Sequence, residues 1–262
     1  MSDPIRRTIL CMVYALLLTA PFSSSRGQTP DEVLTQSDKV RNPGVPFKVH
    51  TELTEFRSGK SHEQAKMVTF SKLDPSTGQY RNLARYVEPT RDAGKALLMK
   101  DSFMWFYDPA SKASVRISPQ QRLIGKASNG DVMSTNLSRD YSAKQATEET
   151  IKDADGVERE TWKLQLEASN SAAVYLRIEY WIEKKTYHPV KGRFFADSGR
   201  LLKIAFYRAF SRQLDGMRPT EVVILDELDR NVVTRMRFSN YEFFDVPERW
   251  YQRDYLPLLP AQ

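Results

Sequence analysis

Most of this chain follows a period of two in its hydrophobic and polar positions. In residues 47–54, 161–167 and 175–183, apolar or β-branched side chains occupy every second position. This alternation is the pattern of a β-strand that buries one face. Together with β-branched and aromatic runs between turn-forming residues, it predicts about ten or eleven strands. The expected strands are residues 47–54, 67–70, 80–86, 96–99, 103–107, 161–167, 175–183, 193–196, 201–208, 221–228 and 232–240.

So many strands with a single dry face indicate a mainly β fold built on an antiparallel sheet. A sheet of this length curls or closes, because its edges and its apolar face need shelter from water. Near the start, residues 30–40 carry apolar side chains on one side, which predicts a short helix. Thr29 or Asp31 can cap its N-terminus. Asn42-Pro43-Gly44 ends this helix before the first strand.

The stretch from Ser118 to Tyr141 breaks the strand rhythm. Its sequence, with Pro119 and Gly125 and the turn at residues 129–131, predicts helical pieces and loops. Such a segment could lie against the concave side of a curved sheet as a plug or lid. Leu123 and Ile124 are its lid candidates.

The first residues have the features of a secretory signal. Arg6 and Arg7 precede an uncharged apolar run from Ile9 to Ala20, and small residues follow it. The run is about 12 residues long, whereas a membrane-spanning helix needs about 20. We therefore expect residues 1–27 to be a signal peptide cleaved near Gly27/Gln28, and residues 28–262 to form a single exported domain.

Charge and cysteine content narrow the class of protein. The formal charge of +6 falls to +4 after residue 27, because three arginines and one aspartate leave. Basic and acidic residues alternate without forming a basic block, so nucleic acid is not an expected partner. The only cysteine, Cys11, lies in the signal, and the exported part has to fold without disulfides.

The chain lacks the usual catalytic and metal-binding patterns. His50, His62 and His188 have no ligand at the spacing of a zinc site, and no Gly-x-Ser-x-Gly or glycine-rich phosphate loop occurs. We therefore predict no cofactor, no metal and no catalytic residue. A hydrolase of envelope polymers ranks last among the functions considered.

Large apolar residues are more numerous than one buried face requires. Residues 103–107, for example, have aromatic side chains at both parities. They either belong to an ordinary core or line a cavity for an acyl chain, since ligand sites are mostly apolar with few polar groups. The apolar parity of the best strands selects the cavity candidates Met104, Phe106, Leu164, Leu166, Ile178, Tyr180, Ile182 and Phe206.

Four segments in order resemble the outer-membrane lipoprotein-sorting protein family. Residues 100–109 (KDSFMWFYDP) are similar to its D-x-M-W-x-Y-x-P strand and turn, and residues 115–118 (VRIS) to its R-R-I-S step. Residues 180–184 (YWIEK) resemble its W-V-D-K strand, and residues 197–203 (DSGRLLK) its D-x-x-G-K-L-L-K hairpin. Residues 135–138 (TNLS) depart from its S-D-F-S pattern, which marks a divergent branch.

The resemblance implies an unclosed, half β-barrel with short helices over the concave face, as in the LolA and LolB carriers. It also implies a non-enzymatic periplasmic carrier of lipid or lipoprotein acyl chains. An inner-membrane lipid exporter and an outer-membrane acceptor would be its partners. The alternative is a structural or regulatory envelope protein that docks a partner through the same sheet, with a strand edge or residues 241–259 as the docking element.

Overall fold

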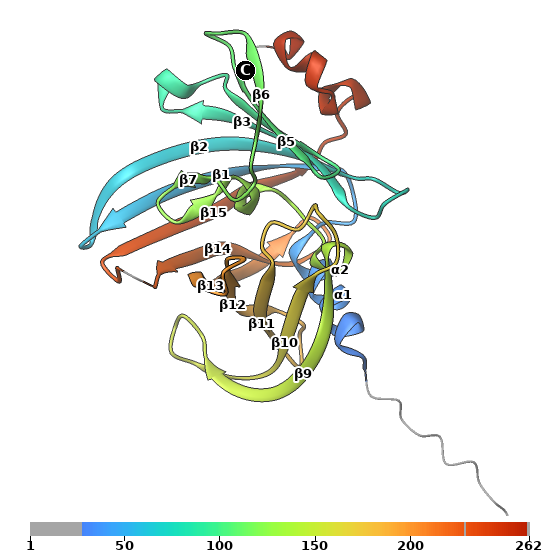
Figure 1. Ribbon diagram of the computed structural model, residues 1–262, viewed down its shortest axis with the longest axis vertical. Helices are drawn as coiled ribbons and strands as arrows, with labels where there is room; N and C mark the ends of the chain where they lie inside the picture. Colours follow the sequence, from blue (N-terminus) through green and yellow to red (C-terminus); the bar gives the residue numbers. More distant parts are fainter. Residues whose placement is uncertain (1–27, 228, 261–262) are drawn as a thin grey trace, which may run out of the picture.

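In the computed structural model, residues 28–227 and 229–260 are described, and thirteen of their strands join in one antiparallel sheet (Figure 1). The predicted signal peptide lies outside the described residues. Six strands follow one another along the chain from the middle of the sheet to one edge. They are β1 (Phe47–Arg57), β2 (Lys60–Leu73), β3 (Tyr80–Glu88), β4 (Ala96–Lys100), β5 (Phe103–Asp108) and β6 (Ala113–Ile117).

The other seven strands run back from the opposite edge to the middle. The pairing of β15 with β1 joins the two halves, and Leu53 lies opposite Met236 across that seam. The strands are β9 (Tyr141–Lys152), β10 (Glu158–Ala168), β11 (Arg177–Glu183), β12 (Pro189–Phe195), β13 (Leu201–Gln213), β14 (Gly216–Asp226) and β15 (Val232–Phe243). The two edge strands β6 and β9 do not pair with each other, so the sheet is curved but not closed.

The chain between β6 and β9 crosses the concave face of the sheet, and we call residues 118–140 the covering segment (Figure 1). Helical pieces and loops are predicted there, and the structure corrects this in part. The segment contains a two-stranded ribbon, because Arg122 pairs with Ser128 and Ile124 with Ala127. Its elements are β7 (Arg122–Ile124), β8 (Ala127–Ser128), η2 (Asn129–Val132) and α2 (Leu137–Asp140).

Helix α1 (Pro30–Arg41) lies beside α2 on the same concave side, where it contacts β9, β11 and β14. The predicted cap is present: the Thr29 hydroxyl accepts from the backbone N–H of Glu32, whose carboxylate accepts from the Thr29 N–H. At the other end, Nη1 of the buried Arg218 donates to the carbonyls of Lys39 and Val40. These bonds satisfy backbone groups that every helix leaves free at its ends.

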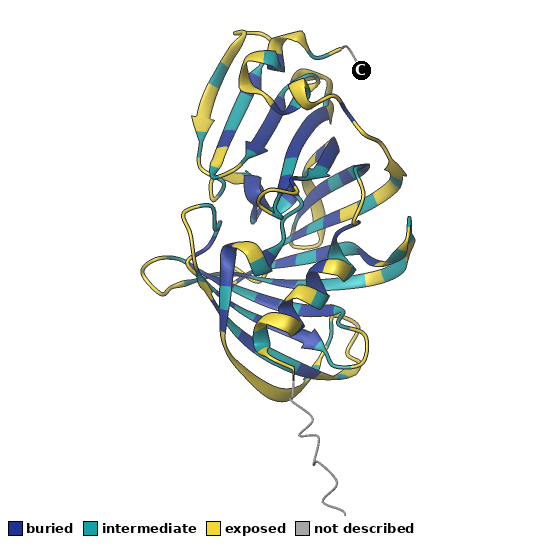
Figure 2. Ribbon diagram, turned by 90° about the vertical axis from the view of Figure 1, so that its right-hand side faces the viewer, coloured by how far each residue is buried: buried dark blue, intermediate teal, exposed yellow. Residues whose placement is uncertain are grey.

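The apolar residues of the concave face, α1 and the covering segment form the main core (Figure 2). The alternation that predicts the strands therefore sorts buried from exposed side chains as expected. The described chain has fifteen strands, and the pattern misses four of them, β6 to β9. In β9 most residues from position 144 onward are exposed, so an edge strand of this kind carries no apolar period.

A second apolar cluster lies on the outer face of β2 to β5. There the tail after β15, with η3 (Glu248–Tyr251) and η4 (Arg253–Leu258), packs against Phe70, Leu98 and Tyr107. The tail buries Val246 and Tyr251 in this contact. Both faces of β5 are thus covered, which explains its large residues at both parities.

The architecture is the one expected: a mainly β chain with a curved, unclosed antiparallel sheet and short helices over its concave face. None of the helices among the described residues has the length and apolar character of a membrane-spanning helix.

Candidate functional site

A cavity of about 140 Å³ lies between the sheet and its cover. Because a void of roughly 10–15 Å³ holds one water molecule, this space admits a ligand of many atoms. The concave face of β1 and β11 to β15 forms its floor, and the end of α1 and the covering segment form its roof. The floor residues are Phe47, Val49, Thr51, Ile178, Phe194, Lys203, Ala205, Tyr207, Pro219, Val222, Ile224, Met236, Phe238 and Tyr241.

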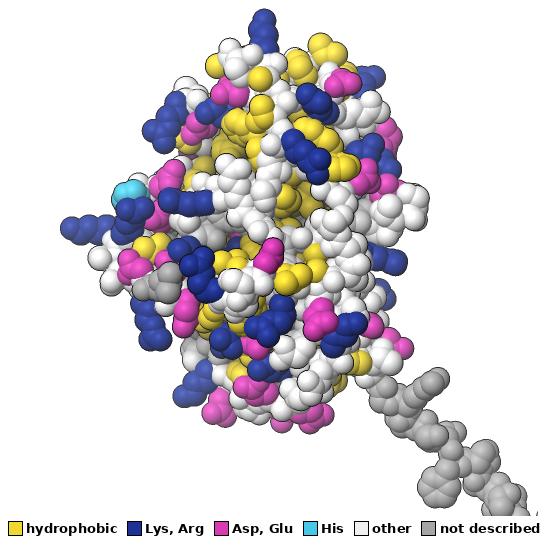
Figure 3. All heavy atoms as spheres, in the orientation of Figure 1, with side chains coloured by type: hydrophobic (Ala, Val, Ile, Leu, Met, Phe, Trp, Pro, Cys, Tyr) yellow, Lys and Arg dark blue, Asp and Glu magenta, His cyan; other side chains and the backbone are white. Residues whose placement is uncertain are grey.

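Most of the wall is apolar. The roof contributes Val132, Met133 and Leu137, which are buried against the floor. On the face drawn in Figure 3, patches of hydrophobic side chains are visible among basic and acidic residues. An apolar wall with a few polar groups is the usual composition of a site for a hydrophobic ligand.

A buried ion pair forms one part of the cavity wall. The Lys203 ammonium on β13 contacts the Asp131 carboxylate of the covering segment and lies 4.8 Å from the ring centroid of Tyr175. The Tyr175 hydroxyl donates to Asp131 at 2.9 Å, and the Ser128 N–H donates to the other carboxylate oxygen at 2.7 Å. Burial lowers the pKa of Lys203, and Asp131 opposes that shift.

Polar contacts hold the covering segment to the sheet at two places. The Lys126 ammonium lies 2.8 Å from Asp226, and its backbone N–H donates to the Thr234 hydroxyl at 2.8 Å. Further along, the buried side chain of Asn82 exchanges two bonds with the backbone of Ser134, at 2.9 and 3.0 Å. These polar contacts fix the position of the roof in addition to the apolar contacts of Val132, Met133 and Leu137.

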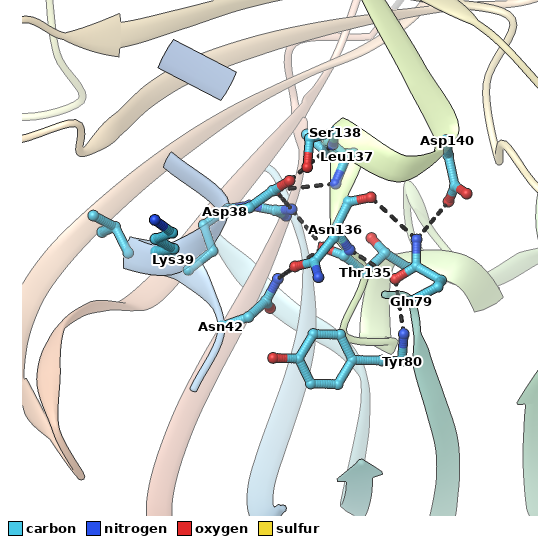
Figure 4. Close-up of polar contacts among 12 residues, drawn as sticks. Asp38, Lys39, Asn42, Gln79, Tyr80, Thr135, Asn136, Leu137, Ser138 and Asp140 are labelled. Atoms are coloured by element: carbon cyan, nitrogen blue, oxygen red, sulfur yellow. Dashed lines mark hydrogen bonds and ion pairs between the residues drawn. The ribbon is translucent and has the colours of Figure 1, made fainter. Parts of the chain in front are cut away.

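The junction of α1 and α2 is also polar (Figure 4). The buried Asp38 carboxylate accepts from the N–H groups of Leu137 and Ser138 at 3.0 and 2.8 Å, and pairs with Arg41 at 2.8 Å. The Arg41 guanidinium also donates to the Thr135 carbonyl at 2.7 Å. Asp38 thus fixes the start of α2 relative to α1.

The predicted cavity residues lie in three places. Ile178 lines the cavity. Leu164, Leu166, Tyr180 and Ile182 are buried on the same concave face of β10 and β11 but outside its wall, and Met104 and Phe106 face the same core from β5. Phe206 lies on the opposite face, because its neighbours Ala205 and Tyr207 line the cavity and its own ring faces Lys191.

The lid candidates both belong to the ribbon β7. Ile124 is buried in the main core, and Leu123 is half-buried against it. The turn after them lies on the sheet, since a Cβ atom at Gly125 would overlap the Thr234 hydroxyl. Neither residue is in the wall of the cavity, so their role as a lid stays a prediction.

Sequence reasoning missed most of the wall. The predicted cavity residues include none from β1, β14 or β15, although Phe47 and Val49 have the required parity. The polar members Asp131 and Lys203 were missed as well. For Lys203 a signal exists, because the hairpin motif at residues 197–203 ends on it. Among the described residues, no group of three or more His, Cys, Asp and Glu is placed to hold a metal ion.

Comparisons with known proteins place the chain in a family. Residues 78–257 match a family model whose description reads "uncharacterized protein". No curated protein sequence matches this chain significantly. A solved LolA superfamily protein from Nitrosomonas europaea is 27% identical, with a TM-score of 0.77 over 87% of this chain and 99% of that one.

Two further solved structures share the fold. An outer-membrane lipoprotein-sorting protein domain from Vibrio parahaemolyticus is 19% identical, with a TM-score of 0.69 over 86% of this chain and 97% of that one. A DUF1329 family protein from Desulfovibrio piger is 18% identical, with a TM-score of 0.71 over 87% and 97%. The chain therefore belongs to the family of the matching model and has the LolA-like fold of outer-membrane lipoprotein-sorting proteins, which confirms the resemblance read from its motifs.

Proposed function

We propose that this chain is a periplasmic carrier that shelters the acyl chains of a lipoprotein or another lipid and moves them between envelope membranes. The cavity under the covering segment is the observation that carries the proposal. Its mostly apolar wall suits hydrocarbon, and its place in a LolA-like fold fits the sorting role named for the Vibrio relative.

The physical need for such a carrier is large. An acyl chain loses about 0.8 kcal/mol for each CH₂ group that moves from an apolar site into water, so it crosses an aqueous space only under shelter. Sheltering and release need no covalent step, and the carrier acts without catalysis. An inner-membrane lipid exporter and an outer-membrane acceptor are its expected partners, and the predicted signal peptide would export it.

Binding of a fluorescent fatty-acyl probe to residues 28–262, with competition by extracted envelope lipids, tests the proposal. We expect saturable binding that Ile178→Asp weakens at least tenfold, because the new carboxylate enters the floor of the cavity. Val157→Asp is the matched control, since Val157 is 48% exposed in the β9–β10 turn.

A second variant protects the test against a folding defect at residue 178. Ala205→Leu adds apolar volume to the same floor without a charge, and we expect it to exclude the longest probes first. Circular dichroism checks the fold of each variant. If the folded wild-type protein binds no probe and carries no lipid after organic extraction, the carrier proposal is wrong and the partner-docking alternative takes its place.

A further inference from the structure

A second hollow, of about 210 Å³, lies next to the cavity, and we call it the polar pocket. It forms where the β2–β3 turn at residues 74–79 and the β4–β5 turn at residues 101–102 meet α2 and the loop at residues 170–172. Most of its lining residues have polar or charged side chains. Asp140, the last residue of α2, lines both the polar pocket and the apolar cavity.

The polar pocket contains an arginine without a carboxylate partner. Arg139 is exposed, and within the part of the chain that the structure describes its guanidinium makes no ion pair and no hydrogen bond. Its position is nevertheless defined, because it lies over Gly78, where a Cβ atom would be 2.6 to 2.8 Å from the guanidinium atoms. Gly78 has φ +70°, so a glycine both forms this turn and leaves room for Arg139.

Two carboxylates of the polar pocket lack a cation in the same described part of the chain. Asp140 is only 4% exposed and accepts from the Gln79 amide at 2.9 Å (Figure 4). It also accepts from the Asn170 amide at 3.4 Å. Burial raises its pKa, as expected for a carboxylate that amides alone stabilise. Asp101 is exposed at the tip of the β4–β5 turn. In contrast, Asp74 pairs with Arg81 at 2.6 Å.

The pocket thus offers one cationic and two anionic positions. A guanidinium binds the oxygens of a phosphate through a planar pair of N–H donors. An ammonium ligand next to a carboxylate that is buried without a cation binds favourably, because the ion pair offsets the free-energy cost of burying the carboxylate. A ligand that carries both a phosphate and an ammonium group matches this arrangement.

We propose that the polar pocket binds a phosphoethanolamine-type group, with its phosphate on Arg139 and its ammonium between Asp101 and Asp140. The inference rests on the proposed function in one respect: it takes the group to be the headgroup of a lipid whose chains occupy the apolar cavity. The shared residue Asp140 places the two ligand parts side by side.

Calorimetric titration of the purified protein with three ligands tests whether the polar pocket binds a phosphoethanolamine-type group. Dihexanoyl-phosphatidylethanolamine carries both charges, dihexanoyl-phosphatidylglycerol carries the phosphate alone, and free phosphoethanolamine carries the headgroup without chains. The lipids are used below their critical micelle concentrations. The fluorescent acyl probe is titrated in parallel, because it reports on the apolar cavity without a headgroup.

We expect the ethanolamine lipid to bind about tenfold more tightly than the glycerol lipid, the effect of one charge-assisted contact. Arg139→Gln should weaken both lipids about tenfold. Asp101→Asn should remove the preference and leave the glycerol lipid unaffected, and asparagine tolerates the φ of +55° at this position. Arg91→Gln is the matched control, since its side chain is 77% exposed and outside both hollows.

Equal affinity for the two lipids, unchanged in Arg139→Gln, would overturn the inference. If the acyl probe still binds in that case, the carrier proposal stands and only the headgroup site is wrong. If the probe does not bind either, the carrier proposal itself fails. Free phosphoethanolamine that binds as tightly as its lipid would support the pocket chemistry and assign it to a soluble zwitterion.

Discussion

At the level of single residues, the floor of the cavity shows why strand parity alone misplaces a side chain. In β13, Leu202, Ile204 and Phe206 form the more apolar set, which favours Phe206 as a cavity residue. The structure turns the other set inward, and that set includes Lys203. A lysine faces the core there because Asp131, 72 positions away, compensates its charge. No local pattern contains that information.

The Lys203–Asp131 pair gives the first prediction. Lys203→Met should destabilise the protein by about 3–5 kcal/mol, because it leaves the Asp131 carboxylate in the roof without its cation. Adding Asp131→Asn should recover part of the loss, since it removes the unpaired charge. Urea unfolding of the two variants measures the difference. A double variant less stable than Lys203→Met alone would contradict this account.

Asp74 gives a prediction on pH. Its bonds to Ser76 and Arg81 lower its pKa from 3.8 to about 2. A carboxyl group with a lowered folded-state pKa stabilises the protein above its unfolded-state pKa, and this contribution is lost as pH falls from about 4 to about 2. Asp74→Asn should therefore lower the melting temperature at pH 7 but have little further effect at pH 2.

Thermal melts of both proteins between pH 7 and pH 2 measure this. The difference between wild type and variant should shrink as the pH falls through that window. If the melting temperatures differ by the same amount at pH 7 and at pH 2, the charge of Asp74 does not stabilise the turn. The lower stability of the variant would then come from the changed shape of the side chain alone.

At the level of elements, strands that are half buried were predictable and elements at the edges were not. The hairpin of β4 and β5 follows from the apolar run of β4, the aromatic run of β5 and the turn at residues 101–102. Strand β9 has mostly exposed residues, and the ribbon β7–β8 is held by contacts to distant strands rather than by its own propensity. In both cases the tertiary partner decides the structure, and a single sequence does not show that partner.

The tail after β15 is an element whose stabilising role can be tested with a matched pair. Leu256 is 1% exposed in the second apolar cluster on the outer face, whereas Leu258 in the same short helix is 66% exposed. Leu256→Ala should lower the free energy of unfolding by about 2–5 kcal/mol, and Leu258→Ala should change it by less than about 0.5 kcal/mol. Denaturant unfolding checks both. Equal effects would mean that the tail does not cover the outer face in solution.

The covering segment can be locked to test whether it moves. A Cβ atom added to Gly125 would lie 3.3 Å from the Cβ of Thr234, close to the roughly 3.5–4.5 Å of a disulfide. Gly125→Cys with Thr234→Cys should form a bond in an exported part that has no other cysteine. If ligands enter by movement of this segment, the oxidised protein should take up the acyl probe at least tenfold more slowly, and reduction should restore the rate.

The reduced protein is the control, because it has the same two substitutions without the bond. The single variant Gly125→Cys shows how much the φ of +55° and the overlap with the Thr234 hydroxyl together disturb the turn. Equal uptake rates in the oxidised and reduced forms would contradict an entry route under the ribbon.

At the level of the whole molecule, one open sheet serves two purposes. Its concave face and cover enclose the cavity, and its outer face at β2 to β5 is closed by the tail. The curved mainly β architecture was predictable, because alternation in many strands and the ordered motifs both point to it. The cavity wall was not, since it is assembled from seven strands, the end of α1, the covering segment and the loop at residues 174–175.

Hydrogen exchange compares the two faces in one experiment. A ligand that binds under the cover should slow amide exchange in residues 126–140 and at the end of α1, because it stabilises the closed arrangement of these segments. It should leave residues 246–259 unchanged, since they lie on the opposite face. Protection of that tail instead, on adding an envelope extract, would indicate a partner docked on the outer face. The pattern of protection therefore separates a carrier, which encloses its cargo, from a docking protein, which holds its partner outside the sheet.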